Sequence, residues 1–315
     1  MKRLLSLIVL ICLILSTFGC SRPSSVSTPS LPSTSTYPMA SNTTALGSTS
    51  PVTYLPPTSN TAPLKELKVY FLDVGQGDSE IVMYGDSTML IDAGTNASTN
   101  TLLSDIKSLG ISRFDIIVAT HPHEDHIGGL DAVINNFNIG KLYMPKVTAT
   151  TKTYTDVLTA IKNKGYTVTT PLPGSTFNLG DAQCTILGPN SQSYEDMNNY
   201  SIVIRVTYGT TSFLFTGDAQ ALSEQEMLAK GFNLKADILK IGHHGSDSST
   251  TLQLLKAVSP QYGIIEVGKG NDYGHPHQTT LDKLAAANVK VYRTDLNGTI
   301  IIKSDGSGLT VTSAR

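Results

Sequence analysis

All seven histidines of this chain lie in three short segments, and this clustering constrains the fold more than any other feature. The segments are Thr120-His-Pro-His-Glu-Asp-His126, Gly242-His-His-Gly-Ser246 and Gly274-His-Pro-His277. A protein that uses histidine for general packing scatters it along the chain. Imidazoles gathered with carboxylates are what a transition-metal site requires. The pattern therefore predicts a metal site.

Residues 1–20 have the pattern of an export signal. Two basic residues open it, and the apolar stretch at 4–15 is too short for a membrane-spanning helix. The end of the segment resembles a lipoprotein signal that leads to Cys20, although Thr17 stands where leucine is usual. We predict that Cys20 is lipidated and that this lipid anchor holds the protein on the outer face of the cell membrane. A plain cleaved signal, which would give a secreted protein, is the alternative.

Residues 21–63 are rich in serine, threonine and proline, and no charged residue occurs between Arg22 and Lys65. Such a segment cannot bury enough apolar area to offset chain entropy, so we predict a disordered tether. The folded domain is predicted to comprise residues 64–315, which is long enough for one substantial core. Its one cysteine, Cys184, excludes a disulfide framework and is expected to be a buried apolar residue.

Strand-like apolar runs and helical periodicities share this domain. Strand patterns occupy residues 67–74, 79–83, 88–92, 115–119, 201–208, 212–215, 238–242, 262–267, 289–293 and 298–303. Helical patterns occupy residues 99–109, 128–137, 154–164, 221–230, 249–258 and 279–287. The order opens with strands joined by tight turns and then alternates strand and helix twice. We therefore predict a pair of mixed sheets covered by helices.

The first histidine segment forms a loop that leaves a predicted buried strand, so its side chains are held at the end of a rigid element. His121 and His123 are two residues apart and can point to the same side to bind one metal. Asp125 and His126 are adjacent and can turn to a second metal. Four ligands within one short loop, two for each cation, are a highly specific spacing. The loop therefore predicts a site for two divalent metal ions, either Zn2+ or Mn2+.

Seven motifs that occur in order carry a resemblance to a known family. They are Phe71-Leu-Asp-Val-Gly-Gln-Gly-Asp-Ser79, Leu90-Ile-Asp-Ala-Gly94, Thr120-His-Pro-His-Glu-Asp-His-Ile-Gly-Gly129, Phe215-Thr-Gly-Asp218, Leu239-Lys-Ile-Gly-His-His-Gly-Ser246, Tyr273-Gly-His-Pro276 and Tyr292-Arg-Thr-Asp-Leu-Asn-Gly298. Together they resemble the hydrolase domain of the ComEC/Rec2 competence proteins and its stand-alone relatives, within the metallo-β-lactamase fold superfamily. The resemblance covers nearly all of residues 67–303. It implies an α/β fold, a four-layer αβ/βα sandwich with metals at one edge of its two mixed sheets.

The resemblance also implies further site residues. Asp218 would bridge both metals, because a shared carboxylate offsets the charge of two neighbouring cations. His243 is expected to be the last ligand, with His244 as the alternative; the other of the two would face substrate or support a ligand. His275 is expected to meet the substrate or the leaving group. The predicted metal ligands are His121, His123, Asp125, His126, Asp218 and His243, and the predicted catalytic residues are His244 and His275.

One feature of the broader superfamily is missing. Many members supply a further histidine to the first metal, between the His-x-His loop and the bridging aspartate, and this chain has none there. Asn198, Asn199 and Ser201 stand in that neighbourhood, where the competence-type relatives carry an Asn/Ser pattern. The first metal is therefore expected to be short of protein ligands. It would be loosely held, completed by water, or a harder ion such as Mn2+.

Two aspartate-containing motifs have open interpretations. The glycine-rich turn before Asp78 either forms a wall of the site, with Gln76 or Asp78 near metal-bound water, or is a tight turn that requires its glycines. Asp92 ends a strand and is expected to support a ligand histidine, with a turn cap as its alternative.

The expected chemistry is hydrolysis, because two adjacent cations lower the pKa of a bridging water and hold hydroxide ready to attack. Neither a nucleophilic-serine motif nor a nucleotide-binding glycine loop competes with this reading. A phosphodiester substrate, DNA included, is favoured, since the domain that the chain resembles is thought to degrade the non-transported DNA strand. A net charge of -2 without a basic stripe leaves long-range attraction to nucleic acid small.

Three alternative functions stay open. They are a phosphocholine-type esterase that acts on wall polymers, a lactonase or β-lactamase, and a metal-binding surface module without catalysis. The missing histidine and the His-His-Gly-Ser segment argue against a β-lactamase, and the nearly whole ligand set argues against a module without catalysis. Beyond the substrate and the membrane, we predict no protein partner.

Overall fold

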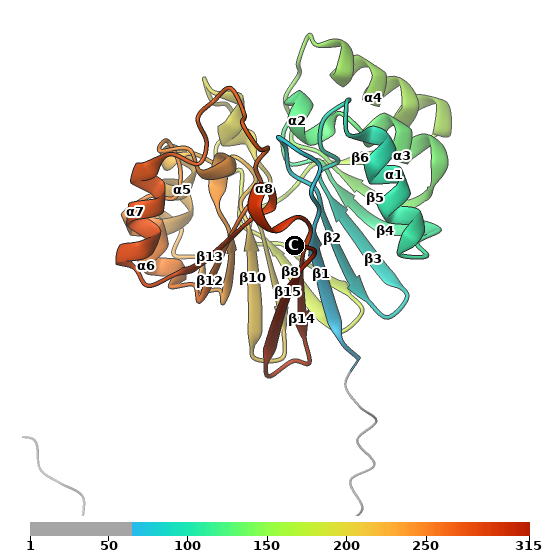
Figure 1. Ribbon diagram of the computed structural model, residues 1–315. Helices are drawn as coiled ribbons and strands as arrows, with labels where there is room; N and C mark the ends of the chain where they lie inside the picture. The colour runs from blue at the N-terminus through green and yellow to red at the C-terminus, as the bar shows by residue number, and fades with distance from the viewer. Residues whose placement is uncertain (1–64) are drawn as a thin grey trace, which may run out of the picture. The chain divides into compact units, whose positions relative to one another are not determined.

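Two facing β-sheets form the centre of the computed structural model, which describes residues 65–315 (Figure 1). In spatial order, the strands of the first sheet are β15 (Leu309–Ser313), β14 (Ile300–Ser304), β1 (Leu67–Phe71), β2 (Glu80–Tyr84), β3 (Ser87–Ile91), β4 (Arg113–Val118), β5 (Asn138–Tyr143) and β6 (Val168–Thr169). Those of the second sheet are β13 (Lys290–Arg293), β12 (Tyr262–Ile265), β11 (Ile238–Lys240), β10 (Thr211–Phe215), β9 (Ile204–Tyr208), β8 (Ala182–Ile186) and β7 (Thr176–Leu179). The predicted export signal, tether and lipidated Cys20 lie outside the described residues.

Both sheets are mixed, and each changes from antiparallel to parallel pairing at one strand. In the first sheet, β1, β2 and β3 are antiparallel, whereas β3 to β6 are parallel. In the second, β7 to β10 are antiparallel, whereas β10 to β13 are parallel. Parallel neighbours need long crossovers, and helices form most of them.

Helices cover the outer face of each sheet (Figure 1). Beside the first sheet lie α1 (Thr99–Ser108), α2 (Glu124–Ile127), α3 (Leu130–Asn136) and α4 (Lys152–Lys164). Beside the second lie α5 (Ala221–Ala229), α6 (Leu252–Val258) and α7 (Gln278–Ala286). Shorter elements are α8 (Thr294–Asn297) and the 3-10 turns η1 (Met197–Tyr200) and η2 (Gly242–Gly245). The predicted four-layer αβ/βα sandwich is confirmed.

Three apolar cores hold the four layers together. Between the sheets, the rings of Phe71 and Phe215 lie 5.9 Å apart, centroid to centroid. A second core joins α1, α3 and α4 to the first sheet around Leu102 and Phe114, and a third lies beneath α5, α6 and α7 around Leu239. Every residue of β10 is buried, because the other sheet covers one face and helices cover the other. Each fully buried side chain of this size contributes about 1.5–3 kcal/mol relative to exposure.

All ten predicted strands and six predicted helices are present, with ends that differ by a few residues. The sequence missed β5, β6, β7, β8 and β15. Of these, β5 contains asparagine, glycine and lysine, β6 spans two residues, and β15 is an edge strand with mostly exposed side chains. β5 and β6 lack the apolar alternation that identifies a strand in isolation, and β15 is too exposed to read as part of a core.

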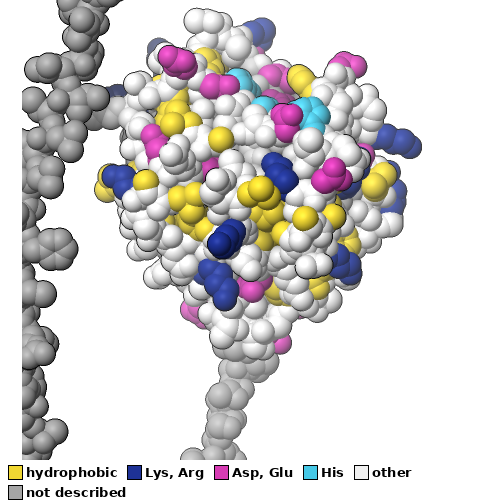
Figure 2. Space-filling view, turned by 90° about the vertical axis from the view of Figure 1, so that its left-hand side faces the viewer, with side chains coloured by type: hydrophobic (Ala, Val, Ile, Leu, Met, Phe, Trp, Pro, Cys, Tyr) yellow, Lys and Arg dark blue, Asp and Glu magenta, His cyan; other side chains and the backbone are white. Residues whose placement is uncertain are grey.

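The parallel strands of both sheets end at the same edge of the sandwich. Their carboxyl ends lead into the loops and turns that carry all three histidine segments: β4 in the first sheet, and β11 and β12 in the second. In Figure 2 histidine side chains emerge near the top of the molecule, beside acidic ones. Sites in mixed α/β sheets commonly lie beyond the carboxyl ends of strands.

Candidate metal centre

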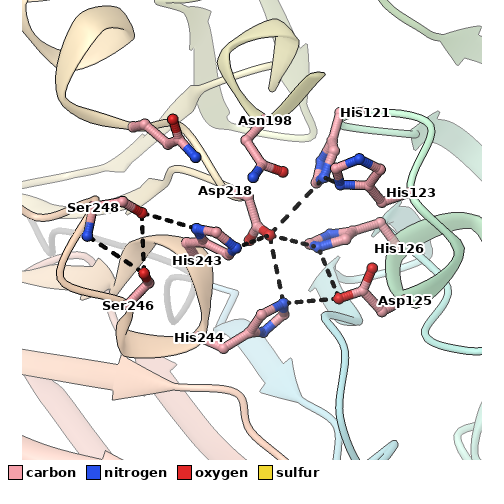
Figure 3. A network of polar contacts seen from close by, with 12 residues as sticks. His121, His123, Asp125, His126, Asn198, Asp218, His243, His244, Ser246 and Ser248 are labelled. Atoms are coloured by element: carbon pink, nitrogen blue, oxygen red, sulfur yellow. Dashed lines mark hydrogen bonds and ion pairs between the residues drawn. The ribbon is translucent and has the colours of Figure 1, made fainter. Parts of the chain in front are cut away.

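The structure brings the eight predicted site residues together: six of them line one pocket, and the buried His121 and His126 lie beside Asp218 (Figure 3). The eight residues are His121 and His123 after β4, Asp125 and His126 in α2, Asp218 after β10, His243 and His244 in η2, and His275 after β12. The sequence placed Asp125 in a loop, whereas the structure has a one-turn helix there. Two acidic residues in the first turn, Glu124 and Asp125, favour this helix because they complement its N-terminal dipole.

Asp218 lies at the centre of the site (Figure 3). Its Oδ2 is 3.3 Å from His126 Nε2, 3.5 Å from His244 Nε2, 3.7 Å from His243 Nε2 and 3.9 Å from His121 Nε2. Its Oδ1 is buried without a hydrogen-bond partner. One carboxylate therefore faces ring nitrogens from all sides, which is the position that a bridging ligand requires.

Four of these residues form a compact group that could hold one cation. The ligand atoms of Asp125, His126, Asp218 and His244 all lie within 4.8 Å of one another. His244 Nε2 is 3.1 Å from Asp125 Oδ2, and the buried His126 Nε2 has no hydrogen-bond partner. Two imidazoles and two carboxylates with lone pairs directed inward suit Zn2+ or a harder divalent ion. This chemistry fits a resident metal.

A second pair of ring nitrogens lies on another side of Asp218. His121 Nε2 and His123 Nδ1 are 3.0 Å apart, closer than two neutral acceptors would choose without a shared proton or cation. His121 Nδ1 is turned away, toward the hydroxyl groups of Thr120 at 3.1 Å and Ser201 at 3.3 Å. With Asp218, these two histidines provide three atoms for another cation.

The two adjacent histidines of η2 point in different directions because both adopt left-handed backbone conformations. The φ angles of His243 and His244 are 51° and 53°. His244 Nδ1 lies 2.9 Å from the carbonyl oxygen of Glu266, which directs Nε2 into the four-residue group. His243 Nδ1 lies 3.0 Å from Ser248 Oγ, and its ring reaches Asp218 from another side. The geometry thus favours His244 over His243 as the ligand in the group with Asp125, His126 and Asp218. Which of the two histidines binds metal stays a prediction.

Asp92 supports the site from behind, as the sequence predicted. Its carboxylate accepts hydrogen bonds from Thr120 N at 2.7 Å and Thr120 Oγ1 at 2.6 Å. His126 Nδ1 is 2.7 Å from Asp92 Oδ2. A buried carboxylate on Nδ1 fixes the ring orientation and leaves the Nε2 lone pair free for a cation.

The glycine-rich turn between β1 and β2 is a tight turn that requires glycine, and it also forms part of the wall of the pocket. A Cβ on Gly77 would lie 2.4 Å from the carbonyl oxygen of Asp125, so only glycine allows this approach. Gln76 lines the pocket, and its Oε1 accepts a hydrogen bond from Gly268 N at 3.1 Å. Asp78 does not line the pocket; it is fully buried, with Oδ1 3.1 Å from His244 Nδ1.

Lys240 is the residue that sequence reasoning missed. Its side chain is fully buried, and its Nζ lies 2.6 Å from Asp78 Oδ2. Glu80 and Glu266, also buried, form the rest of this cluster. The sequence did contain a signal for a buried ion pair: a lysine ends a buried apolar strand, and a buried ammonium requires a carboxylate partner. The identity of the partner could not be predicted, since Asp78 lies in the turn before β2 of the other sheet.

The protonation states of the site follow from its crowded charges. Burial by itself raises the pKa of Asp218, but the imidazoles of His244 and His126 outweigh it and hold that pKa well below the usual range. Burial lowers the pKa of His244, whereas Asp218 and Asp78 outweigh it and raise it to about 10. Burial, with His126 next, holds the pKa of His121 well below the usual range. Without a metal, protons therefore supply the positive charge that this site stabilises.

The pocket in front of these groups has a volume of about 570 Å³. It is lined by Gln76, Thr95, His123, Glu124, Asp125, Thr151, Asn198, Asp218, His243, His244, Tyr273 and His275. The rings of His275 and His243 lie 5.4 Å apart, and burial, with His243 next, lowers the pKa of His275 to about 4. Its imidazole is therefore neutral near pH 7. His277 is no part of this lining, and its Nδ1 accepts a hydrogen bond from Asp247 N.

The fold and the site together define a class: a four-layer α/β sandwich with a histidine–carboxylate centre at the ends of its strands. The family model of the metallo-beta-lactamase superfamily matches residues 72–268, so the chain belongs to that superfamily, whose members are generally metal-dependent hydrolases. Within residues 65–315, no helix is both long enough and apolar enough to cross a membrane.

Curated relatives narrow the family further. The chain is 32% identical to ComE operon protein 3 of Bacillus subtilis over 75% of its own length and 33% of the relative's. It is 31% identical to competence protein ComA of Neisseria gonorrhoeae over 76% of its length and 32% of that protein. The chain thus spans about a third of the length of the relatives it matches. The predicted resemblance to the hydrolase domain of ComEC-type proteins is confirmed.

A solved structure shares the fold at low identity. The metallo-beta-lactamase fold protein YhfI from Bacillus subtilis aligns with 76% of this chain and 100% of its own, with a TM-score of 0.50 and 14% identity. At this identity the likeness concerns the fold alone.

Proposed function

We propose that this protein is an extracytoplasmic metal-dependent phosphodiesterase that acts on nucleic acid. The observation that carries the proposal is Asp218, whose Oδ2 lies between the paired histidines of the β4 loop and the imidazoles of His126 and His244. A carboxylate shared by two ligand sets suits two neighbouring cations, and paired cations serve in-line displacement at phosphorus in phosphatases and nucleases.

Two divalent cations, when bound, would activate water and stabilise charge on the phosphoryl oxygens. The chain's own groups hold the ligands in place: Asp92 orients His126, and the carbonyl oxygen of Glu266 orients His244. His275, neutral at the rim, is placed to donate a hydrogen bond to the leaving oxygen.

Support for a nucleic-acid substrate comes from the relatives and from the mouth of the pocket. Two relatives are named for competence or recombination: competence protein ComA of Neisseria gonorrhoeae and recombination protein 2 of Haemophilus influenzae. Tyr273 is 66% exposed, lines the pocket and stacks on His275 with ring planes 22° apart. An exposed aromatic face beside a phosphodiester site suits a nucleobase. The same face favours a second candidate, a phosphocholine esterase, because a quaternary ammonium binds over an aromatic ring.

The activity is tested first with bis-p-nitrophenyl phosphate. The purified protein is expected to hydrolyse this diester when Mn2+ or Zn2+ is supplied, and Asp218→Ala is expected to abolish turnover. Absence of turnover with every divalent ion would sink the enzyme proposal, and full activity in Asp218→Ala would contradict the bridging role.

The substrate class is tested by a panel of single-stranded DNA, a phosphocholine ester and a β-lactam. We expect DNA to be preferred, with a KM that rises at least several-fold in Tyr273→Ala and is retained in Tyr273→Phe. A preference for the choline ester would transfer the proposal to the second candidate, and a preference for the β-lactam would refute both.

The location is a separate proposal, because Cys20 lies outside the described residues. We propose that Cys20 carries a lipid anchor on the outer membrane face. Incorporation of labelled palmitate that is lost in Cys20→Ala is the expected result. Label retained in that variant would overturn the assignment.

A further inference from the structure

The two ligand sets around Asp218 are unequal. On one side, Asp125, His126 and His244 accompany Asp218 in a closed group of four. On the other side, only His121 and His123 do so. A cation held there would have three protein ligands, one fewer than its neighbour.

Asn198 lies beside the poorer set. The residue is 6% exposed and lines the pocket. Its Oδ1 is buried and has no hydrogen-bond partner. In Figure 3 its amide group points toward Asp218, and Asn198 lines the same pocket as His123 and Asp218. Folded proteins rarely leave a buried carbonyl oxygen unpaired, because it has given up its water without compensation.

The turn that carries Asn198 is attached to the site by Ser201. Ser201 Oγ accepts a hydrogen bond from Asp218 N at 3.1 Å and lies 3.3 Å from His121 Nδ1. At the start of the turn, Asp196 Oδ1 accepts a bond from Asn198 N at 2.9 Å. The turn is therefore held at the site by two anchors, and the Asn198 side chain that it carries lines the pocket.

The neighbouring Asn199 shows what a structural asparagine looks like in the same turn. Its Oδ1 accepts hydrogen bonds from Gln220 N and Ser223 N, both at 3.3 Å, and so ties the turn to α5. Asn198 Oδ1 makes no such bond. The adjacent pair thus divides into one amide that holds the fold and one that is open toward the pocket.

We propose that Asn198 Oδ1 is the missing ligand of the cation held by His121 and His123. This inference rests on the proposed metal-dependent function and specifies one of its two sites. Two imidazoles, one carboxylate and one amide oxygen form a harder donor set than three imidazoles and a carboxylate. The site therefore accommodates Mn2+ better, relative to Zn2+, than a histidine at the same position would.

The test measures metal binding rather than turnover. The full chain is freed of metal and titrated with Mn2+, followed by calorimetry and by the electron paramagnetic resonance signal of free Mn2+. The wild type is expected to bind two ions. Asn198→Leu, which keeps the side-chain shape, is expected to weaken one of the two binding events by roughly tenfold to a hundredfold, the scale seen for groups around metal sites. Asn198→His is expected to bind Zn2+ more tightly, relative to Mn2+, than the wild type does.

A stability measurement separates a ligand from a structural residue. Without metal, Asn198→Leu removes an unpaired buried acceptor, so its urea midpoint is expected to equal or exceed that of the wild type. With Mn2+ present, the order is expected to reverse. The matched control is Asn190→Leu, because Asn190 Oδ1 is also buried without a partner but lies outside the pocket. Both metal-binding events are expected to persist in this control.

The outcomes distinguish this inference from the proposed function. Two unchanged Mn2+ binding events in Asn198→Leu would overturn the ligand assignment, whether or not the protein hydrolyses diesters. Loss of one event in a protein that hydrolyses nothing would support the ligand and refute the hydrolase. If Asn198→Leu fails to fold, the Zn2+ preference of Asn198→His decides, and an unchanged preference overturns the proposal.

Discussion

Replacement of Asp92 by asparagine changes one charge and one hydrogen-bonding pattern behind the proposed metal site. The carboxylate accepts three short bonds: from Thr120 N, from Thr120 Oγ1 and at the Nδ1 of His126. In Asp92→Asn the amide oxygen can keep the bond from Thr120 N, and the threonine hydroxyl can rotate to accept from the amide. The contact with His126 cannot be replaced in the same way, because an amide N–H that faces Nδ1 forces the imidazole proton of His126 onto Nε2. That nitrogen then lacks the lone pair that a cation needs.

The expected magnitude follows from the bond that is lost. A hydrogen bond to a charged acceptor contributes roughly 1.5–3 kcal/mol. With about 2 kcal/mol lost at His126, metal affinity falls roughly 30-fold, since each 1.4 kcal/mol is a factor of ten. This lies within the tenfold to hundredfold range known for partners of metal-binding histidines.

Calorimetric titration of the metal-free protein with Mn2+ measures the affinity, and nitrogen NMR of the imidazoles reads the tautomer of His126. The matched control is Asp237→Asn, because Asp237 accepts bonds from Ser212 N at 2.8 Å and Ser212 Oγ at 3.1 Å at the opposite ends of the strands. Metal affinity in the control is expected to stay at the wild-type value. Wild-type affinity and an unchanged tautomer in Asp92→Asn would refute the reasoning.

Three further perturbations test other parts of the structure. Lys240→Met leaves Asp78 buried without its ammonium partner and is expected to cost about 3–5 kcal/mol in urea unfolding, whereas the double variant with Asp78→Asn should recover part of this loss. Burial raises the pKa of Cys184 to about 12, against about 8.5 in the unfolded chain. The contribution of this thiol to the free energy of unfolding is therefore complete below about pH 8.5 and falls by about 1.4 kcal/mol per pH unit above it. Cys184→Ala is expected to lack this alkaline slope, and equal slopes between pH 8.5 and 10 would contradict the burial argument. Removal of metal by a chelator, from a protein loaded at a hundred times its Kd, should cost about 2.7 kcal/mol and lower the Tm by roughly 5–10 °C in calorimetry; an unchanged Tm would mean that no metal stabilises the fold.

Local patterns in the sequence predicted the pair of mixed sheets and the grouping of the first histidine segment, whereas the four-layer arrangement and the role of Asp218 followed from the family resemblance. The strand before His121 ends in three consecutive buried apolar residues, and the ligand spacing of the following segment needs no tertiary information. Asp92 could be interpreted because it ends a strand beside that of His121, so its carboxylate had a nearby histidine to support.

Features of the site that depend on contacts between distant residues could not be predicted from the sequence. The choice between His243 and His244 depends on two consecutive residues in the left-handed conformation, which is uncommon for any residue other than glycine. The burial of Lys240 depends on Asp78, which lies in the turn before β2 of the other sheet. More than half of the folded domain separates these two residues along the chain. The unpaired amide oxygen of Asn198 could be recognised only from the structure, in which the amide oxygen of the neighbouring Asn199 has hydrogen-bond partners.

The buried acids behind the site do not all carry charge. Lys240 neutralises Asp78 through their contact of 2.6 Å. Burial, with Asp78 next, raises the pKa of Glu266 to about 8, and burial with Glu266 next holds the pKa of Glu80 well above its usual range. Near pH 7 Glu266 is therefore mostly protonated, and the raised pKa of Glu80 lowers its negative charge as well, so the cluster adds less negative charge to the site than its three carboxyl groups suggest.

The charges that remain give a physical reason for a diester substrate. Asp92, Asp125 and Asp218 supply three negative charges around the centre. Two divalent cations, as proposed, would bring four positive charges, and the hydroxide that they activate adds a fourth negative charge, which leaves the centre near neutral. A phosphodiester adds one negative charge to this centre, whereas a phosphate monoester adds between 1.5 and 2 at about pH 7. Because uncompensated charge in a buried site is costly, the balance favours a diester over a monoester for the proposed activity.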